Sequence, residues 1–304
     1  MHAICALYKF TRLDDFETIQ SPLKGFLDSL SVKGTLLLAR EGINGTISGN
    51  QSSLEKVLEY LQSDSRFLGL EYKFSYSKKT PFKRLKVKLK KEIVTMGLTE
   101  IDPTHSVGTY VKPKDWNKLI NDPDVVLIDT RNNYEYEIGS FKGAVNPKTE
   151  TFREFPSFTK NSLEKYRNKK IAMFCTGGIR CEKASAYLND KGFKNIFQLR
   201  GGVLNYLKKI KKKNSMWKGE CFVFDNRVSV KHDLVVGSYF VCGGCRNPVS
   251  PNEKRSKKYE EGVSCSKCYD TLTKVQKTRF RMRQKQINLA KSAGKKHIFQ
   301  KEFK

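Results

Sequence analysis

The chain has 304 residues and a mass of 34.9 kDa, and its 58 Lys and Arg against 31 Asp and Glu give a formal net charge of +27. The length allows two or three domains, and a hydrophobic content of 38% excludes wholesale disorder, collagen and a coiled-coil rod. The sequence has neither the 18 or more consecutive apolar residues of a membrane span nor a signal peptide at its start, so we expect a cytoplasmic protein with no membrane partner.

The positive charge lies in several separate clusters, which favours a polyanionic partner, above all nucleic acid. The alternative is a basic proteome in which many proteins carry spare lysines. Charge alone does not say which nucleic acid binds or why.

Residues 1–100 alternate strand and helix signals. We expect strands over 4–10 and 35–39, a helix over 15–30, a turn at Gly42–Gly45 before a strand over 46–48, and a helix over 52–61 that Ser52 and Glu55 cap. A β-prone stretch follows over 72–94. The order β-α-β-β-α-β predicts a ferredoxin-like (acylphosphatase-like) α+β domain.

One β-prone segment of this domain alternates apolar and basic side chains. Leu85, Val87 and Leu89 would lie on one face of a strand, and the other face would carry four cations: Arg84, Lys86, Lys88 and Lys90. This face is either a solvated strand surface or a phosphate-binding surface.

Residues 101–118 read as a polar linker with Pro103 and Pro113. Residues 119–214 have an α/β pattern, with short apolar runs at 125–128, 170–174 and 195–199 that are typical of buried parallel strands. Helices are expected over 181–191 and from about residue 203.

Residues 215–304 form a third, basic region. Eleven Lys and Arg and one acid, Glu302, lie between residues 271 and 304, and apolar residues recur at seven-residue spacing. We expect a basic helix with a thin apolar stripe, and Arg279, Arg281 and Arg283 are candidate contacts to RNA phosphates.

The most informative segment is the loop Cys175, Thr176, Gly177, Gly178, Ile179 and Arg180. An apolar strand ends at the cysteine, and a helix begins about five residues later. Backbone N–H groups of the loop, the positive end of the helix and Arg180 all favour thiolate over thiol, so Cys175 is expected to have a lowered pKa and to act as a nucleophile or sulfur carrier. The alternative is a small buried residue at a strand end.

The loop length argues against phosphatase chemistry. Cysteine phosphatases place five residues between the cysteine and the arginine that surround a phosphate, whereas the seventh position here is Cys181. The shorter loop suits a persulfide or another sulfur-sized group.

These motifs resemble the rhodanese family: the segment 129–139 with Gly143–Asn146, the loop 175–180, and the closing segment 199–203. The match is closer to the tRNA uridine(34) hydroxylase (TrhO) branch, through Cys175–Lys183, Arg40–Thr46 and Thr149–Pro156. Ser140 departs from the histidine that often follows the glycine in rhodaneses. The resemblance covers essentially the whole chain.

The resemblance implies oxygen-dependent 5-hydroxylation of the wobble uridine of tRNA, with Cys175 in the persulfide position and molecular oxygen as co-substrate. The sequence carries no flavin, haem, nicotinamide or non-haem iron motif and does not identify the electron donor. The alternatives are a sulfurtransferase that moves persulfide sulfur to a small acceptor or protein and a non-enzymatic nucleic-acid-binding protein.

Three further residues are candidates for supporting Cys175. Cys181 is either a resolving thiol or a helix residue with no redox role. Arg131 either reaches the active loop, as in the rhodanese pattern, or pairs with Glu135 or Glu137. Asp129 is expected to brace backbone amides rather than to do chemistry.

Two Cys-x-x-Cys pairs lie in the basic region: Cys242 and Cys245, and Cys265 and Cys268. Four thiolates at this spacing are typical of a zinc ribbon, so we predict a closed structural zinc site. Disulfides or free thiols are the alternative.

Overall fold

The computed structural model describes residues 1–294, which divide into a first unit, Met1–Gly237, and a second unit that begins at Ser238. Two domains make up the first unit. Within the described residues, no helix has both the length and the apolar character that crossing a bilayer would require.

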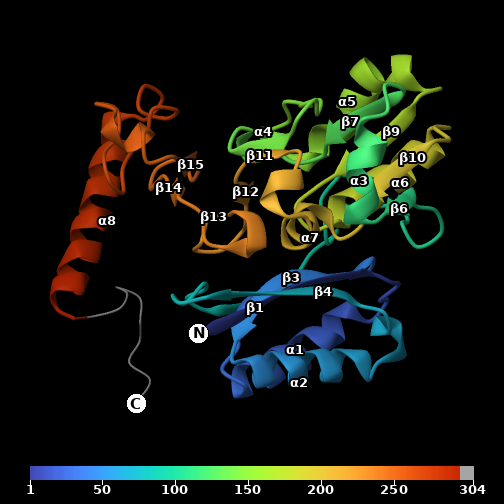
Figure 1. Cartoon of the computed structure of the whole chain (residues 1–304). Coiled ribbons are helices and arrows are strands. Elements are labelled where there is room, and N and C mark those ends of the chain that lie inside the picture. The colour runs from blue at the N-terminus through green and yellow to red at the C-terminus, as the bar shows by residue number, and fades with distance from the viewer. Residues whose placement is uncertain (295–304) are drawn as a thin grey trace. The chain divides into compact units, whose positions relative to one another are not determined.

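The N-terminal domain has two helices on one side of a sheet (Figure 1). Its strands follow the order β4-β1-β3-β2-β5, with β5 parallel to β2 and the other pairs antiparallel, which confirms the predicted α+β class. The elements are β1 (His2–Phe10), α1 (Phe16–Ser29), β2 (Lys33–Ala39), β3 (Gly42–Gly49), α2 (Gln51–Gln62), β4 (Glu71–Ser77) and β5 (Leu85–Leu89).

Two local predictions in this domain were wrong. The turn lies at residues 40–41, and the predicted turn Gly42–Gly45 is the start of β3. The glycines serve close backbone approach instead, because a Cβ on Gly45 would lie 2.1 Å from the carbonyl oxygen of Thr35 on β2. Ser52 does not cap α2, since the helix begins one residue earlier, with Asn50 at the N-cap.

The central domain is built on a four-stranded parallel sheet of order β6-β10-β9-β7. A connection between parallel strands needs a crossover, and helices supply it here. The elements are β6 (Thr109–Val111), α3 (Pro113–Ile120), β7 (Val125–Asp129), α4 (Asn133–Tyr136), β8 (Gly139–Phe141), α5 (Phe155–Phe158), β9 (Lys170–Phe174), α6 (Ile179–Asp190), β10 (Ile196–Leu199), α7 (Gly202–Lys209), β11 (Trp217–Gly219), β12 (Cys221–Phe222) and β13 (Ser229–Val230).

Strand β9 lies between two apolar cores, so its residues point alternately into each. Ile171 and Met173 pack with residues of α5 and α6, whereas Ala172 and Phe174 pack with residues of α3 and α7. A strand buried on both faces explains the continuous apolar run in the sequence. It also fixes Cys175 at the carboxyl end of a rigid central strand.

The structure differs from the expected linker at 101–118 and from the expected third region. Strand β6 and the start of α3 lie in that linker segment. Strand β11 pairs with β8 of the central domain, so residues 217–219 belong with the first unit.

The second unit contains β14 (Phe240–Val241), β15 (Pro248–Val249) and α8 (Lys274–Ser292). Thr273 caps α8 through a capping box with Gln276. The helix is the predicted basic one. Its apolar stripe of Val275, Met282 and Leu289 is 79%, 62% and 60% exposed, respectively. The predicted basic region continues to residue 304, and its part over 295–304, with Glu302, lies outside the described residues.

Candidate functional site

The Cys175 loop joins β9 to α6 and turns sharply at Gly178. That residue has a φ of 118°, which an L side chain rarely adopts, and it directs its backbone N–H to the Cys175 sulfur at 3.0 Å. Ile179 begins α6 and packs against apolar residues of the N-terminal domain. The loop therefore holds the sulfur beside a helix N-terminus and an oriented amide.

The surroundings of Cys175 favour the thiolate. Burial alone would raise its pKa, but a hydrogen bond from Cys181, the positive charge of Arg180 and backbone N–H groups outweigh burial and lower the pKa to about 5. A thiolate is the nucleophilic form of cysteine, and it is the form that would attack a sulfur donor to give a persulfide. This direction agrees with the one expected from the loop sequence.

Arg180 is held in place by Glu135, a residue that the sequence interpretation considered only as an alternative partner for Arg131. The guanidinium donates to the Glu135 carboxylate at 2.6 and 2.9 Å, and Thr176 donates to the same carboxylate at 3.1 Å. Glu135 is fully buried, and burial opposes its ionisation, but the charge of Arg180 holds its pKa below the ordinary value. Glu135 thus fixes both side chains that flank the loop glycines.

The closing segment packs directly on the loop. Val203 and Leu204 donate backbone N–H groups to the carbonyl oxygens of Cys175 and Thr176, at 2.9 and 3.1 Å. A Cβ on Gly202 would lie 2.5 Å from the Cys175 carbonyl oxygen. Only a glycine lets α7 approach closely enough to make these bonds.

Among the contacts of the described residues, the Arg131 guanidinium bonds to residues outside the active loop, and the charge of Glu135 also acts on it. Its guanidinium bonds to Asp129 at 2.6 and 2.8 Å and to the Gly139 carbonyl oxygen at 2.6 Å, with its side chain fully buried. The Asp129 carboxylate, two residues away in the sequence, neutralises the charge of the Arg131 guanidinium. Asp129 also accepts from the Arg131 backbone N–H, so it braces local backbone.

Cys181 lies beside Cys175 in the first turn of α6 and is buried. Burial and the hydrogen bond to Cys175 raise its pKa well above the ordinary value, so it is the protonated partner of the pair. Its sulfur is also 3.5 Å from the Thr130 hydroxyl oxygen. A thiolate next to a thiol is the arrangement that disulfide formation requires.

The N-terminal domain contributes two side chains to the loop that sequence reasoning missed. Lys73 on β4 donates to the Gly177 carbonyl oxygen at 3.0 Å. The Tyr8 hydroxyl lies against Gly178, where an added Cβ would approach it to 2.7 Å, and it donates to Glu182 at 2.6 Å. Burial raises the pKa of the Glu182 carboxyl, and the hydrogen bonds from Tyr8 and Tyr110 oppose that rise.

Lys183 extends this contact between the domains. Its ammonium group is fully buried and bonds to Glu41 at 2.6 Å and to Glu92 at 2.7 Å. Glu92 is fixed in turn by the backbone N–H groups of Met96 and Gly97, both at 2.9 Å. Two segments that are far apart in the sequence, Arg40–Thr46 and Cys175–Lys183, therefore meet at one buried cluster of charged groups.

The four paired cysteines of the second unit form a candidate metal centre. Their sulfurs all lie within 4.8 Å of one another, at 3.7 Å for Cys242 and Cys268 and for Cys245 and Cys265, and 3.9 Å for Cys265 and Cys268. Disulfide bonds would need about 2.0 Å, whereas four sulfurs about 2.3 Å from a tetrahedral zinc are separated by about 3.8 Å. The donor set and its spacing fit a closed structural metal site.

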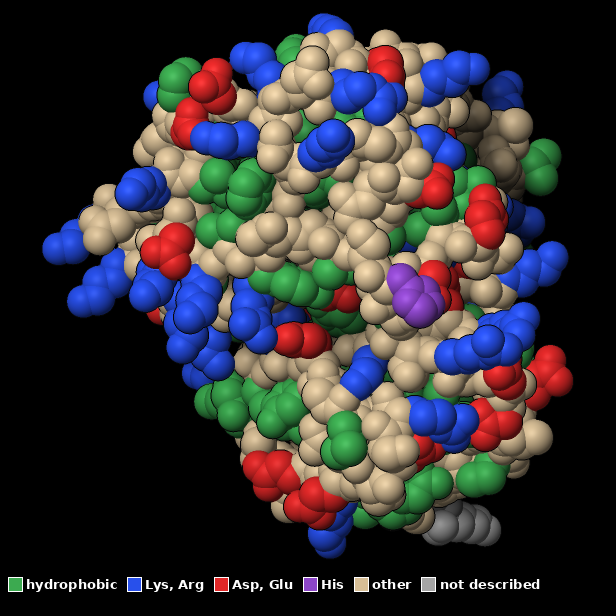
Figure 2. Space-filling view, turned by 90° about the vertical axis from the view of Figure 1, so that its right-hand side faces the viewer, with side chains coloured by type: hydrophobic (Ala, Val, Ile, Leu, Met, Phe, Trp, Pro, Cys, Tyr) green, Lys and Arg blue, Asp and Glu red, His purple; other side chains and the backbone are tan. Residues whose placement is uncertain are grey.

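The predicted cationic face of β5 is only partly exposed. Arg84, Lys88 and Lys90 are exposed, but Lys86 is half-buried, and partial burial together with its cationic neighbours lowers its pKa. Figure 2 shows Lys and Arg side chains spread over one face of the molecule. The phosphate-binding role of β5 stays a prediction.

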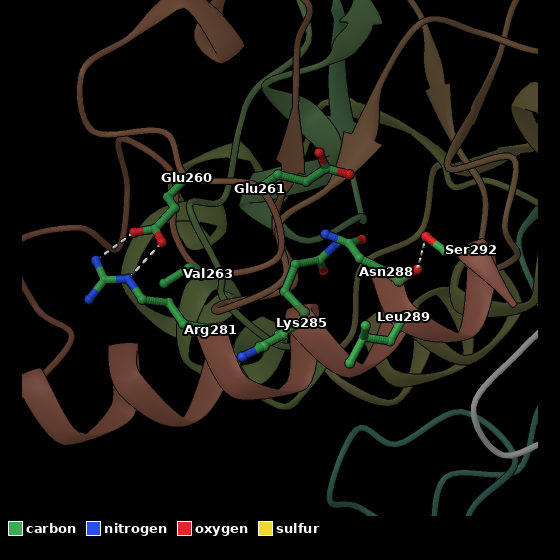
Figure 3. A pocket seen from close by; sticks show the side chains of 9 residues that line it. Glu260, Glu261, Val263, Arg281, Lys285, Asn288, Leu289 and Ser292 are labelled. Carbon is green, nitrogen blue, oxygen red and sulfur yellow. Dashed lines mark hydrogen bonds and ion pairs between the residues drawn. The ribbon is translucent and has the colours of Figure 1, made fainter.

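Two of the three arginines predicted for RNA contact are engaged within the second unit. Arg281 pairs with Glu260 through two bonds of 2.6 Å at the edge of a pocket on α8 (Figure 3). Arg283 donates to the carbonyl oxygens of Gly243 and Gly262 at 2.6 and 2.9 Å. It therefore supports the backbone around the two Cys-x-x-Cys pairs, which we call the knuckles. Arg279 is exposed.

Solved structures with similarity to part of the chain include two rhodanese-like proteins. One is the rhodanese-like domain of an Anabaena protein, 18% identical, covering 37% of this chain and 80% of that chain with a TM-score of 0.30. The other is a rhodanese-related protein from Thermoplasma volcanium, 23% identical, covering 33% and 90% with a TM-score of 0.27.

Family models match both domains of the first unit. Residues 2–93 match the UPF0176 acylphosphatase-like domain, and residues 112–209 match the rhodanese-like domain. The matched ranges contain Glu41 and Cys175, respectively. A UPF0176 acylphosphatase-like domain followed by a rhodanese-like domain is the architecture of the TrhO family, and this chain has that architecture.

Proposed function

We propose that this protein is a tRNA-modifying oxidoreductase that hydroxylates C5 of the wobble uridine, position 34, with molecular oxygen as co-substrate. The observation that carries the proposal is the shared site: a cysteine loop that favours the thiolate is contacted by Tyr8 and Lys73 of a second, basic domain. A sulfur-transferring domain acting on small molecules has no evident need for that second domain.

The reaction balances with one molecule of oxygen and a dithiol reductant. The C5–H bond becomes C5–OH, the second oxygen atom leaves as water, and a thiolate and a thiol become one disulfide and supply two electrons and one proton, while solvent supplies the second proton. Cys175 and Cys181 are hydrogen-bonded neighbours, so they are the candidate internal dithiol, which an external thiol would reduce again. Arg180 would stabilise the thiolate, and Glu135 would position Arg180.

We also propose tRNA as the partner and zinc as the metal of the second unit. The net charge of +27 supports a polyanionic partner. The tetrahedral spacing of Cys242, Cys245, Cys265 and Cys268 supports zinc, which would hold the knuckles in shape without taking part in the reaction.

Mass spectrometry of tRNA nucleosides from a deletion strain tests the function. Wild-type protein is expected to restore 5-hydroxyuridine, and Cys175→Ser is expected to reduce it to the level of the empty vector. Full 5-hydroxyuridine with Cys175→Ser would exclude the proposed role of this sulfur. Protein yield and tRNA binding are measured in parallel to show that the variant is folded.

A sulfurtransferase is the second candidate, because the short loop around Cys175 suits a persulfide. A thiosulfate–cyanide assay on purified protein separates the two functions. Rapid sulfur transfer without 5-hydroxyuridine formation would favour the second candidate.

A further inference from the structure

A cleft of about 310 Å³ opens between the two domains of the first unit, and Glu182 of α6 is part of its lining. Its volume is at the lower end of the range for small-molecule sites. The lining comes from both domains and includes Tyr8, Glu71, Tyr110, Glu182 and Arg200. The mechanism above uses none of these side chains for chemistry.

The cleft reaches the reactive sulfur through two contacts. Tyr8 lines the cleft, and its hydroxyl lies against Gly178. The Gly178 N–H is itself bonded to the Cys175 sulfur at 3.0 Å. A ligand in the cleft would therefore be separated from the Cys175 sulfur by the Tyr8 side chain and Gly178.

The polar groups of the cleft offer acceptors next to a donor. Glu182 accepts from the hydroxyls of Tyr8 and Tyr110, and a carboxylate has about four lone-pair positions, so acceptor capacity remains. Arg200 has five N–H donors, and its guanidinium lies 5.9 Å from the centre of the Tyr110 ring. The Tyr110 side chain is partly exposed and presents an aromatic face.

We propose that this cleft is a uracil-binding subsite, in which Glu182 accepts the N3–H of the base, Arg200 donates to the O4 carbonyl oxygen, which cytosine lacks, and Tyr110 stacks on the ring. The proposal rests on the proposed function, since it identifies where the target base binds. Uracil presents a donor flanked by two acceptors, whereas cytosine presents an acceptor at N3 that would face the Glu182 carboxylate. Aromatic stacking of an unpaired base is a common mode of RNA recognition.

The same groups disfavour a small anionic sulfur donor in this cleft. Glu71 and Glu182 both border it, and its two cations are engaged: Lys9 bonds to the Leu68 carbonyl oxygen, and Arg200 lies 3.8 Å from the Glu71 carboxylate. The two carboxylates would repel the thiosulfate dianion, whereas they would not repel a neutral base.

Binding to two anticodon stem-loop RNAs, identical except for U or C at the wobble position, tests the subsite. The full-length chain carries Cys175→Ser throughout, so that no reaction occurs. We expect the U loop to bind about tenfold tighter than the C loop, about 1.4 kcal/mol. Glu182→Gln should reduce this ratio to less than threefold, because the glutamine amide pairs with either base.

Two further variants keep the test interpretable. Glu100→Gln makes the same charge change at an exposed position that does not line the cleft, and it should keep the tenfold ratio. Arg200→Gln leaves the buried Tyr8–Glu182 bond intact, and it should reduce the ratio even if Glu182→Gln fails to fold. The ratio is the readout, because a lost phosphate contact would weaken both RNAs equally.

The subsite is overturned if the parent protein does not distinguish U from C, or if both cleft variants keep its preference. Because the assay measures binding alone, it is independent of hydroxylation. Loss of the preference in the cleft variants, together with no 5-hydroxyuridine from the wild-type protein, would support the subsite and reject the proposed function. An unchanged preference in the cleft variants, together with 5-hydroxyuridine from the wild-type protein, would do the reverse.

Discussion

Lys183 and Glu41 are 142 residues apart in the sequence, and their charged groups are 2.6 Å apart in the structure. Lys183 lies eight positions after the reactive cysteine, on helix α6, which directly follows the cysteine loop. The contact ties the first turns of α6 to the hairpin between β2 and β3. Replacement of either residue is therefore expected to disturb the contact between the two domains.

Lys183→Met is expected to destabilise the protein by about 3–5 kcal/mol, because it leaves Glu41 and Glu92 buried without a cation. Denaturant unfolding measures the change. Lys191→Met is the matched control, since its ion pair with Asp190 is about half exposed and is worth at most about 1 kcal/mol. Equal unfolding midpoints for the two variants would contradict a structural role for the buried cluster.

The thiolate of Cys175 should titrate near pH 5, and its signal should be lost as pH falls through that value. The difference in ultraviolet thiolate absorbance between wild type and Cys175→Ser isolates this sulfur from the others. Glu135→Gln should move the midpoint upward, because Arg180 loses its anchor and stabilises the thiolate less. A midpoint above pH 8 in the wild type would contradict the thiolate-stabilising contacts described for this loop.

Purified protein is expected to contain about one zinc per chain. Cys242→Ser or Cys265→Ser should remove it and leave the region from Ser238 sensitive to protease, because metal binding and folding are coupled at such sites. Cys5→Ala removes a buried thiol of the N-terminal domain and should keep the metal. A metal-free preparation in which the second unit is equally resistant to protease would contradict the zinc-ribbon interpretation.

Lys86→Glu with Lys88→Glu should weaken tRNA binding and flatten its salt dependence, since each lost phosphate contact lowers the logarithmic slope by about 0.9. Filter binding at several salt concentrations measures both quantities. Lys24→Glu with Lys56→Glu makes the same charge change on α1 and α2 and should have a smaller effect. If the two pairs behave alike, only overall charge matters, and the tRNA does not contact β5.

The sequence was sufficient to predict a site where the site's function depends on residues that are close together in the sequence. The loop from Cys175 to Arg180 lies between a strand and a helix, and the cysteine pairs meet as their spacing predicts. Both patterns are short, and their chemistry comes from residue types at fixed intervals.

Contacts across long sequence separations were not predictable in this way. Tyr8 and Glu182 are 174 residues apart, and nothing local to Tyr8 distinguishes it from an ordinary strand residue. Arg283 looked like an RNA contact because it lies in a basic run, but two carbonyl groups of the knuckles take its guanidinium. Only tertiary structure decides which charged residues remain free to bind a ligand.

The consecutive residues Glu182 and Lys183 have a consequence for protein engineering. Both side chains leave α6 toward partners in the N-terminal domain, and both are buried there. Excision of the rhodanese-like domain would expose this polar surface and remove Tyr8 and Lys73 from the loop. The two domains are therefore not interchangeable modules, and a chimera should keep residues 1–237 together.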